Sequence, residues 1–276
     1  MNSKLLNFGI INIDKPRGPT SFAVTEFVRS SLGLNKASHM GTLDPKVTGV
    51  LPITLGRACR LSDFFMRHDK TYVGVLHTHK ESDMAKIQDI INRDFIGTIE
   101  QIPPHKSSVK RALRKRKVYF FNLLEKKGRN FLFECKVEGG TYIRKICSDL
   151  GEKIGGAHMA ELRRTVAGIF DESTIKTLSE FENAVSEWKK GNDKPLKEMI
   201  LPAEEALKMV MPEVELKSSS IKRLLTGKPL FKSDIVKIPN FEDGEFFAGF
   251  CNGQLIAVYR VSSEGKILAR PKFVYN

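Results

Sequence analysis

The decisive stretch of this sequence reads Gly41-Thr-Leu-Asp-Pro-Lys-Val-Thr-Gly49, called the Asp44 loop below. Asp44 is followed by Pro45 and lies between two glycines, which predicts a tight turn. One explanation is an Asx turn, in which the Asp44 carboxylate binds its own backbone. The other is that a rigid turn holds one carboxylate at a cleft, as a nucleophile or a base. The spacing alone leaves both open, and Asp44 is a candidate catalytic residue.

Hydrophobic periodicity outside the Asp44 loop predicts interleaved helices and strands. Strands are expected at 8–13, 71–77, 118–124 and 131–137, and helices at 20–32, 57–66, 85–95, 142–154 and 178–189. Residues 35–49 are expected to form a loop. Because no regular βαβ alternation is present, the predicted fold class is α/β mixed (α+β), with a central mixed or antiparallel sheet.

A second, smaller domain is predicted at the C-terminal end of the chain. The composition becomes polar between residues 191 and 202. After Pro212 the pattern predicts a short helix at 218–225 and strands at 245–250, 255–261 and 267–269. With 276 residues available, we expect a large domain at 8–205 and a compact, mostly β unit at 210–276.

The charge balance favours a polyanionic partner. The 45 Lys+Arg and 32 Asp+Glu residues give a net charge of +13, and each cation placed on a phosphate releases counterions. Seven cations lie close together without an acid among them: Lys106, Lys110, Arg111, Arg114, Lys115, Arg116 and Lys117. A solvated face is the alternative. Since like charges repel, contact with an RNA backbone is the preferred interpretation.

Several classes of protein and site are not expected. The four cysteines are widely spaced, which argues against zinc sites and disulfides and fits a reducing compartment. No apolar run approaches the roughly 18 residues of a membrane span, and residues 1–14 do not resemble a secretory signal. His39 has no companion at metal-ligand spacing, and the pair His77 and His79 is equally unconvincing, so no metal is predicted.

Two tyrosines and an arginine are candidates for contact with a nucleic-acid base. Tyr72 lies in Lys70-Thr-Tyr-Val73, and Tyr142 and Arg144 lie in Gly140-Thr-Tyr-Ile-Arg144. Most tyrosines in strands and helices are ordinary packing residues, but RNA enzymes use such rings to stack on an extruded base. Arg144 is a solvated helix residue or, if it lies near Asp44, an ion-pair partner that keeps the carboxylate ionised.

Five motifs occur in order between residues 8 and 172. They are Asp14-Lys-Pro-Arg-Gly-Pro-Thr-Ser21, His39-Met-Gly-Thr-Leu-Asp-Pro-Lys-Val-Thr-Gly49, Lys70-Thr-Tyr-Val73, Gly140-Thr-Tyr-Ile-Arg144 and Gly156-Ala-His-Met-Ala-Glu-Leu-Arg-Arg-Thr165. Together they resemble the TruB/dyskerin family of pseudouridine synthases. The resemblance implies a mixed α/β catalytic domain that isomerises uridine in RNA, with no metal or organic cofactor.

The resemblance also implies roles for individual positions. Asp44 matches the family's catalytic aspartate, Tyr72 the tyrosine that stacks on the target base, and Arg144 the arginine paired with the aspartate. The other matched positions bind the substrate or support the loop. They are Tyr142, Ile143 and Leu162 in the pocket, His39 in extrusion of the target base, and Lys15 and Pro16 beneath the catalytic loop.

Residues 103–119 resemble the archaeal and eukaryotic dyskerin-type branch more than the bacterial transfer-RNA enzymes. The chain also lacks the insertion with which bacterial members grip the T arm. That branch works with a guide RNA and small proteins in a box H/ACA ribonucleoprotein, and residues from about 210 resemble a PUA RNA-binding domain. We therefore expect guide-directed modification of ribosomal RNA by a cytoplasmic protein. The alternatives are a stand-alone synthase for the transfer-RNA T arm and a catalytically silent RNA-binding scaffold.

Overall fold

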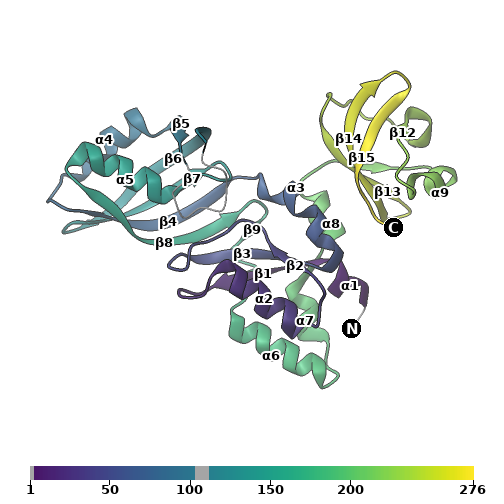
Figure 1. Ribbon diagram of the computed structural model, residues 1–276, viewed down its shortest axis with the longest axis horizontal. Coiled ribbons are helices and arrows are strands. Elements are labelled where there is room, and N and C mark those ends of the chain that lie inside the picture. The colour runs from purple at the N-terminus through teal and green to yellow at the C-terminus, as the bar shows by residue number, and fades with distance from the viewer. Residues whose placement is uncertain (1–2, 103–111) are drawn as a thin grey trace. The chain divides into compact units, whose positions relative to one another are not determined.

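The computed structural model describes residues 3–102 and 112–276 (Figure 1). The chain divides into two compact units. The larger unit contains residues 11–200 and the N-terminal residues up to Asn7, and the smaller contains residues 8–10 and 201–276. Within the described ranges, no helix is both long and apolar enough to span a membrane.

A large mixed sheet forms the centre of the larger unit. Its strands lie in the order β1 (Gly9–Lys15), β3 (Thr48–Leu55), β8 (Ala157–Ala167), β4 (Lys70–Thr78), β7 (Asn130–Val137), β6 (Arg114–Lys127) and β5 (Gly97–Gln101). The short strands β2 (Ala37–His39) and β9 (Phe170–Asp171) pair with β3 and β8. β3 and β8 are parallel, whereas β4 is antiparallel to both β7 and β8. The predicted mixed sheet is confirmed.

Helices cover the larger unit's sheet with their apolar faces. α4 (Met84–Asp94) and α5 (Ile143–Ile154) lie together on one face of the part formed by β4 to β8 (Figure 1). Ile87, Ile91, Ile146 and Leu150 from these helices are buried in the core cluster. The remaining helices are α1 (Ser3–Asn7), α2 (Ser21–Ser31), η1 (Gly56–Leu61), α3 (Ser62–Met66), α6 (Leu178–Lys189) and α7 (Lys194–Met199).

The pairing of β4 with β8 places the residues that matter for the site. β4 alternates between buried and half-buried positions, so Tyr72 and Gly74 both face the core. Tyr72 pairs with Arg164, and Gly74 pairs with Leu162. A Cβ added to Gly74 would lie 2.6 Å from the Phe133 ring and 2.8 Å from the Leu162 side chain. A glycine is therefore required here for Leu162 to pack under the strand.

The smaller unit is built mostly from strands. Its sheet has the order β11 (Glu213–Glu215), β13 (Phe246–Cys251), β14 (Gln254–Glu264), β15 (Ile267–Val274) and β12 (Leu230–Phe231). β10 (Ile200–Pro202), α8 (Ala203–Lys208), η2 (Ser218–Ser220), α9 (Ile221–Leu224) and η3 (Lys232–Asp234) complete the chain. Leu224, Phe247 and Tyr259 are fully buried in this unit's own core.

The helices predicted from periodicity agree with α2, α4, α5 and α6 to within one or two residues. The strand predictions need correction in several places. Residues 35–49 include β2 and the start of β3 and are not one loop. β5 and β8 were not predicted; apolar and polar residues do not alternate regularly in β8, and its strand conformation depends on pairing with β4. β6 begins at Arg114 and not at residue 118, because residues 114–117 pair with β5.

Candidate active site

The Asp44 loop connects β2 to β3 and contains a hydrogen-bonded turn. The Val47 amide donates to the Asp44 carbonyl at 2.9 Å, with Pro45 at the second position. Gly49 has φ +103°, and a Cβ added to it would lie 2.2 Å from the carbonyl oxygen of Arg164. Backbone hydrogen bonding thus closes the turn, and the loop's last residue lies directly against β8.

The Asp44 carboxylate forms an ion pair with Arg144. This is the partner expected for Asp44 if the two side chains lie close together. Arg144 lies in the first turn of α5, and its Nη2 donates to Oδ2 of Asp44 across 100 residues of sequence. The two side chains are 46% (Asp44) and 51% (Arg144) exposed. A pair this exposed contributes about 0–1 kcal/mol to stability. Its effect is therefore to orient a carboxylate that solvent, or a substrate, can still reach.

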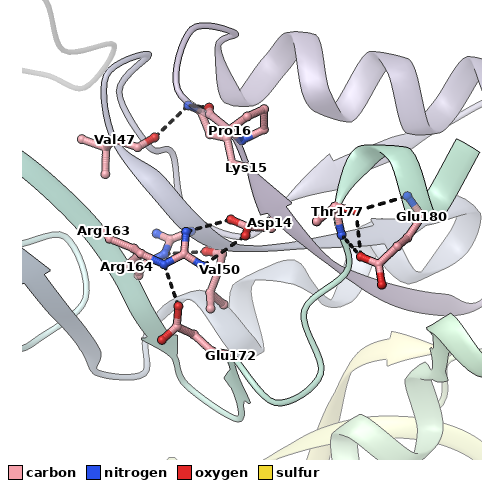
Figure 2. A network of polar contacts seen from close by, with 10 residues as sticks. All are labelled: Asp14, Lys15, Pro16, Val47, Val50, Arg163, Arg164, Glu172, Thr177 and Glu180. Atoms are coloured by element: carbon pink, nitrogen blue, oxygen red, sulfur yellow. Dashed lines mark hydrogen bonds and ion pairs between the residues drawn. The ribbon is translucent and has the colours of Figure 1, made fainter.

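Lys15, at the end of β1, lies completely buried beneath the loop. Its ammonium donates to the carbonyls of Pro16, Pro45 and Val47 at 3.0, 3.2 and 2.8 Å, and Figure 2 shows it directed at Val47. Burial lowers the pKa of Lys15 below its usual value, while the nearby Asp44 charge raises it. Lys15 and Pro16 are thus located where support of the loop was predicted.

Ser21 connects α2 to the same loop, a contact that the sequence reasoning missed. Its hydroxyl donates to the Leu43 carbonyl at 2.9 Å and accepts from the Leu43 amide at 2.8 Å. Leu43 immediately precedes Asp44. Ser21 ends the first of the five motifs, and its neighbour Thr20 caps α2. The position of Asp44 is therefore coupled to the start of α2.

His39 lies at the entrance to the loop, between two threonines. The Thr25 hydroxyl donates its single proton to the Ser21 carbonyl at 2.8 Å. In its contact of 3.2 Å with Nδ1 of His39, the hydroxyl can therefore only accept, and Nδ1 donates. Nε2 lies 3.1 Å from the Thr42 hydroxyl. Burial, and then the charge of Arg164, lower the pKa of His39. The ring is therefore neutral at pH 7, with the proton on Nδ1.

The remaining predicted pocket residues surround the loop from β4, β8 and α5. Tyr72, Ile143 and Leu162 are buried in one cluster that also contains Leu43 and Val47 of the loop. Burial raises the pKa of Tyr72, and the charge of Arg164 and a hydrogen bond to it act in the opposite direction.

Tyr142 is the N-cap residue of α5, and Gln101 on β5 holds its backbone. The Tyr142 amide donates to Oε1 of Gln101 at 3.0 Å, and Nε2 of Gln101 donates to the Tyr142 carbonyl at 3.1 Å. Gln101 was not singled out from the sequence. Because Arg144 follows two residues later, this contact also helps to fix the helix turn that presents Arg144.

Arg164, like Ser21 and Gln101, is a functional candidate that the sequence reasoning missed. It is 1% exposed, and its guanidinium donates from Nε to the Val50 carbonyl at 2.8 Å and from Nη2 to the Gly41 carbonyl at 3.0 Å. The motif Gly156–Thr165 contains it, but an arginine in a polar segment carries no signal of burial. Only the pairing of β8 with β4 places it inside the core.

Four of the seven residues of the predicted basic run are part of the sheet. Lys106, Lys110 and Arg111 lie outside the described residues, whereas Arg114, Lys115, Arg116 and Lys117 belong to β6. The run contains no acid in sequence, yet Glu138 lies 3.7 Å from Arg116 and forms an ion pair with it. Lys115 and Lys117 are exposed, and the Lys117 ammonium lies 5.1 Å from the centre of the Tyr119 ring.

The site therefore presents one oriented carboxylate beside a buried aromatic ring and an apolar lining. Such a carboxylate can serve as a nucleophile or as a base. Among the described side chains, no three His, Cys, Asp or Glu residues are arranged to hold a metal ion.

Comparison with known proteins identifies the class of enzyme to which this site belongs. The model of the TruB family pseudouridylate synthase N-terminal domain matches residues 29–143, and that of the tRNA pseudouridylate synthase B C-terminal domain matches residues 144–208. A relative from Methanopyrus kandleri, "Probable tRNA pseudouridine synthase B", is 40% identical over 270 residues, which is 97% of this chain and 77% of the relative. A relative of the same name from Methanocaldococcus jannaschii is 38% identical over 99% of this chain and 80% of its own length.

Solved structures agree with these relatives. A chain in the crystal structure of a Cbf5-Nop10-Gar1 complex superposes with a TM-score of 0.87 at 37% identity, covering 98% of this chain and 85% of that one. A chain in an H/ACA RNP bound to a substrate RNA containing 2'-deoxyuridine gives 0.87 at 35% identity, covering 99% and 86%.

The chain belongs to the TruB family of pseudouridine synthases. It is an isomerase that converts uridine to pseudouridine in RNA, which confirms the activity expected from the five motifs. The expected mixed α/β catalytic fold is confirmed as well.

Proposed function

We propose that this chain modifies ribosomal RNA as the catalytic subunit of a box H/ACA ribonucleoprotein, in which a guide RNA selects the uridine by base pairing. The likeness to chains solved in H/ACA complexes extends over nearly all of this chain, and the net charge of +13 favours RNA partners. Its other partners would be small proteins of the kind represented by Nop10 and Gar1 in those structures. We place the protein in the cytoplasm.

For the two units we propose a catalytic domain at 8–205 and a PUA-like RNA-binding domain at 210–276. The division of the chain after Ile200 supports a separate C-terminal unit. Its mostly β composition and independent core also support this proposal.

For the site we propose that Asp44 is the catalytic carboxylate and that Arg144 keeps it ionised and oriented. Tyr72 would stack on the target uracil, Tyr142, Ile143 and Leu162 would line the pocket, and His39 would assist extrusion of the base, with Lys15 and Pro16 supporting the loop. The observation that carries this proposal is the ion pair between Asp44 and Arg144, made by a loop anchored on Lys15.

The proposed chemistry needs no group beyond these side chains. The bond between uracil N1 and ribose C1' breaks, the base turns, and a bond forms between C5 and C1'. N1 gains a proton and C5 loses one. Asp44 would attack the sugar or the ring, or remove a sugar proton, and these three routes remain alternatives. An enclosed pocket keeps the detached base from escaping.

Asp44→Asn tests the site, because the change keeps the side chain's shape and removes its charge. Loss of the C5 proton allows turnover to be followed as tritium released from RNA labelled at that carbon. We expect no turnover, with RNA affinity within about twofold of the unmodified protein. Asp63→Asn, at an exposed position of α3, is the matched control. Turnover retained in Asp44→Asn would remove Asp44 from its proposed role.

A stand-alone activity on the transfer-RNA T arm is the second candidate, favoured by the names of the relatives at 38–40% identity. Purified chain should be incubated with an unmodified transfer-RNA transcript, and separately with ribosomal RNA fragments, guide RNA and the small proteins. Conversion only in the second mixture supports guide dependence. Robust conversion of the transfer RNA by the chain alone contradicts a guide-only enzyme.

We also propose that the basic run binds RNA phosphates, through Lys106, Lys110, Arg111, Arg114, Lys115, Arg116 and Lys117. The exposure of Lys115 and Lys117 supports this, whereas Arg116 is already paired with Glu138. Lys115→Gln with Lys117→Gln should reduce the slope of log affinity against log salt by about 0.7 to 0.9 for each phosphate that the variant no longer neutralises. An unchanged slope contradicts phosphate binding by these two residues.

A further inference from the structure

Arg164 is one of the largest fully buried side chains of the described residues, and it is charged, with 1% of its surface exposed. A guanidinium does not deprotonate in proteins, so its charge remains inside. Burying such a charge is unfavourable by several kcal/mol unless hydrogen bonds compensate. The groups that receive its hydrogen bonds therefore indicate what the residue does.

Two of these acceptors flank the Asp44 loop. Nη2 donates to the carbonyl of Gly41, the first residue of the loop, and Nε donates to the carbonyl of Val50, just after its last residue. Figure 2 shows Arg164 beside Val50. Because a guanidinium is planar and carries donors on several sides, one group can hold both ends of the loop at a set separation.

The loop backbone approaches Arg164 closely at both ends. A Cβ added to Gly41, which has φ +96°, would lie 3.2 Å from Nη1 of Arg164. The glycine at the other end, Gly49, has its closest approach to the Arg164 backbone. The two glycines that frame the loop in sequence are therefore the residues that let it rest on Arg164.

Arg164 also faces Tyr72 directly across the β8–β4 pair. The field of Arg164 reaches the loop as well, since its charge lowers the pKa of His39.

We infer that Arg164 is a positioning residue for uridine isomerisation, holding both ends of the Asp44 loop against the β8–β4 pair that carries Tyr72. The carboxylate and the aromatic ring then keep a constant separation while the base detaches and turns between them. This inference rests on the roles proposed above for Asp44 and Tyr72.

Arg164→Lys tests the inference, because lysine keeps the charge but cannot reach both carbonyls. We expect the single-turnover rate of tritium release to fall on the order of 10²-fold, the usual effect of a displacement near 1 Å. RNA affinity should stay within about threefold. Ile91→Ala on α4, fully buried away from the loop, serves as a control that lowers stability alone. An equal fall in rate for Ile91→Ala, per folded molecule, overturns the inference.

Gly41→Ala keeps Arg164 intact and displaces one end of the loop. It therefore tests the positioning role of Arg164 even if Arg164→Lys does not fold. We expect a fall in the single-turnover rate with RNA binding retained. Arg163→Lys is the control on the same strand, since Arg163 pairs with Asp14 at 3.0 Å and Glu172 at 2.6 Å. Its rate should stay within about twofold. Unchanged rates in the folded Arg164→Lys and Gly41→Ala variants overturn the inference, whereas activity in Asp44→Asn overturns the proposed site itself.

Discussion

Replacing Lys15 with methionine should release the Asp44 loop from its support. The side chain is completely buried and donates to three carbonyls. In this variant the Pro45 carbonyl still accepts a hydrogen bond from the Gly18 amide at 2.8 Å. The carbonyls of Pro16 and Val47 lose the hydrogen bond from the Lys15 ammonium. The Val47 contact is buried and the Pro16 contact only partly so, and one unsatisfied buried acceptor costs about 1–3 kcal/mol. Relief of the buried ammonium offsets part of this, as its lowered pKa indicates. We expect a net destabilisation of about 2 kcal/mol.

The single tryptophan of the chain makes this destabilisation measurable in the larger unit. Trp188 lies on α6, so its fluorescence during urea unfolding reports on that unit alone. Tritium release under single-turnover conditions reports on the loop, and we expect a fall of about 10²-fold. Lys46→Met alters an exposed lysine of the same loop and should change stability by less than about 0.5 kcal/mol. If Lys15→Met has the same stability in urea and the same rate of tritium release as the unmodified protein, the three carbonyl contacts do not hold the loop.

Three further substitutions give distinct expected outcomes. Gly49→Ala forces a Cβ to 2.2 Å from the Arg164 carbonyl at φ +103°, and should destabilise the larger unit by more than about 3 kcal/mol in the Trp188 assay; stability close to that of the unmodified protein would contradict the close approach. Arg144→Gln should lower turnover at least about 10²-fold while stability changes by less than about 1 kcal/mol, because the ion pair is half exposed; a large decrease in stability with normal turnover would reverse this interpretation. Burial lowers the pKa of Lys70 to about 8 from 10.5. Between these two pH values the unfolded state therefore binds more protons than the folded state. The free energy of unfolding then rises with pH, by up to about 3 kcal/mol. In Lys70→Met this rise should be absent, and a constant stability difference between the two proteins from about pH 7.5 to 10 would show that Lys70 does not titrate in this way.

Local patterns were sufficient for the helices and for the residue types at the site. The apolar spacing of α4, α5 and α6 repeats with the helical period, and that period depends only on neighbouring residues. The motifs likewise identified Asp44, Tyr72 and Arg144 as candidates, because each lies in a short, ordered run of sequence.

The strands of the central sheet were harder to predict, because a strand is stabilised by its neighbours. β8 has no regular alternation of apolar and polar residues, and it is a strand because β4 pairs with it along most of its length. The same dependence explains the basic residues of β6, which pair with β5 even though their sequence indicates an exposed run of charge.

By itself, then, the sequence determined the four longest helices (α2, α4, α5 and α6), the mixed fold class, the family and the carboxylate at the centre of the site. Only the tertiary structure decided what surrounds that carboxylate. Arg144 reaches Asp44 across 100 residues, and Lys15, Ser21 and Arg164 hold the loop from three separate elements. The physical reason is that burial and hydrogen bonding of these groups arise between segments distant in sequence, where no local periodicity records them.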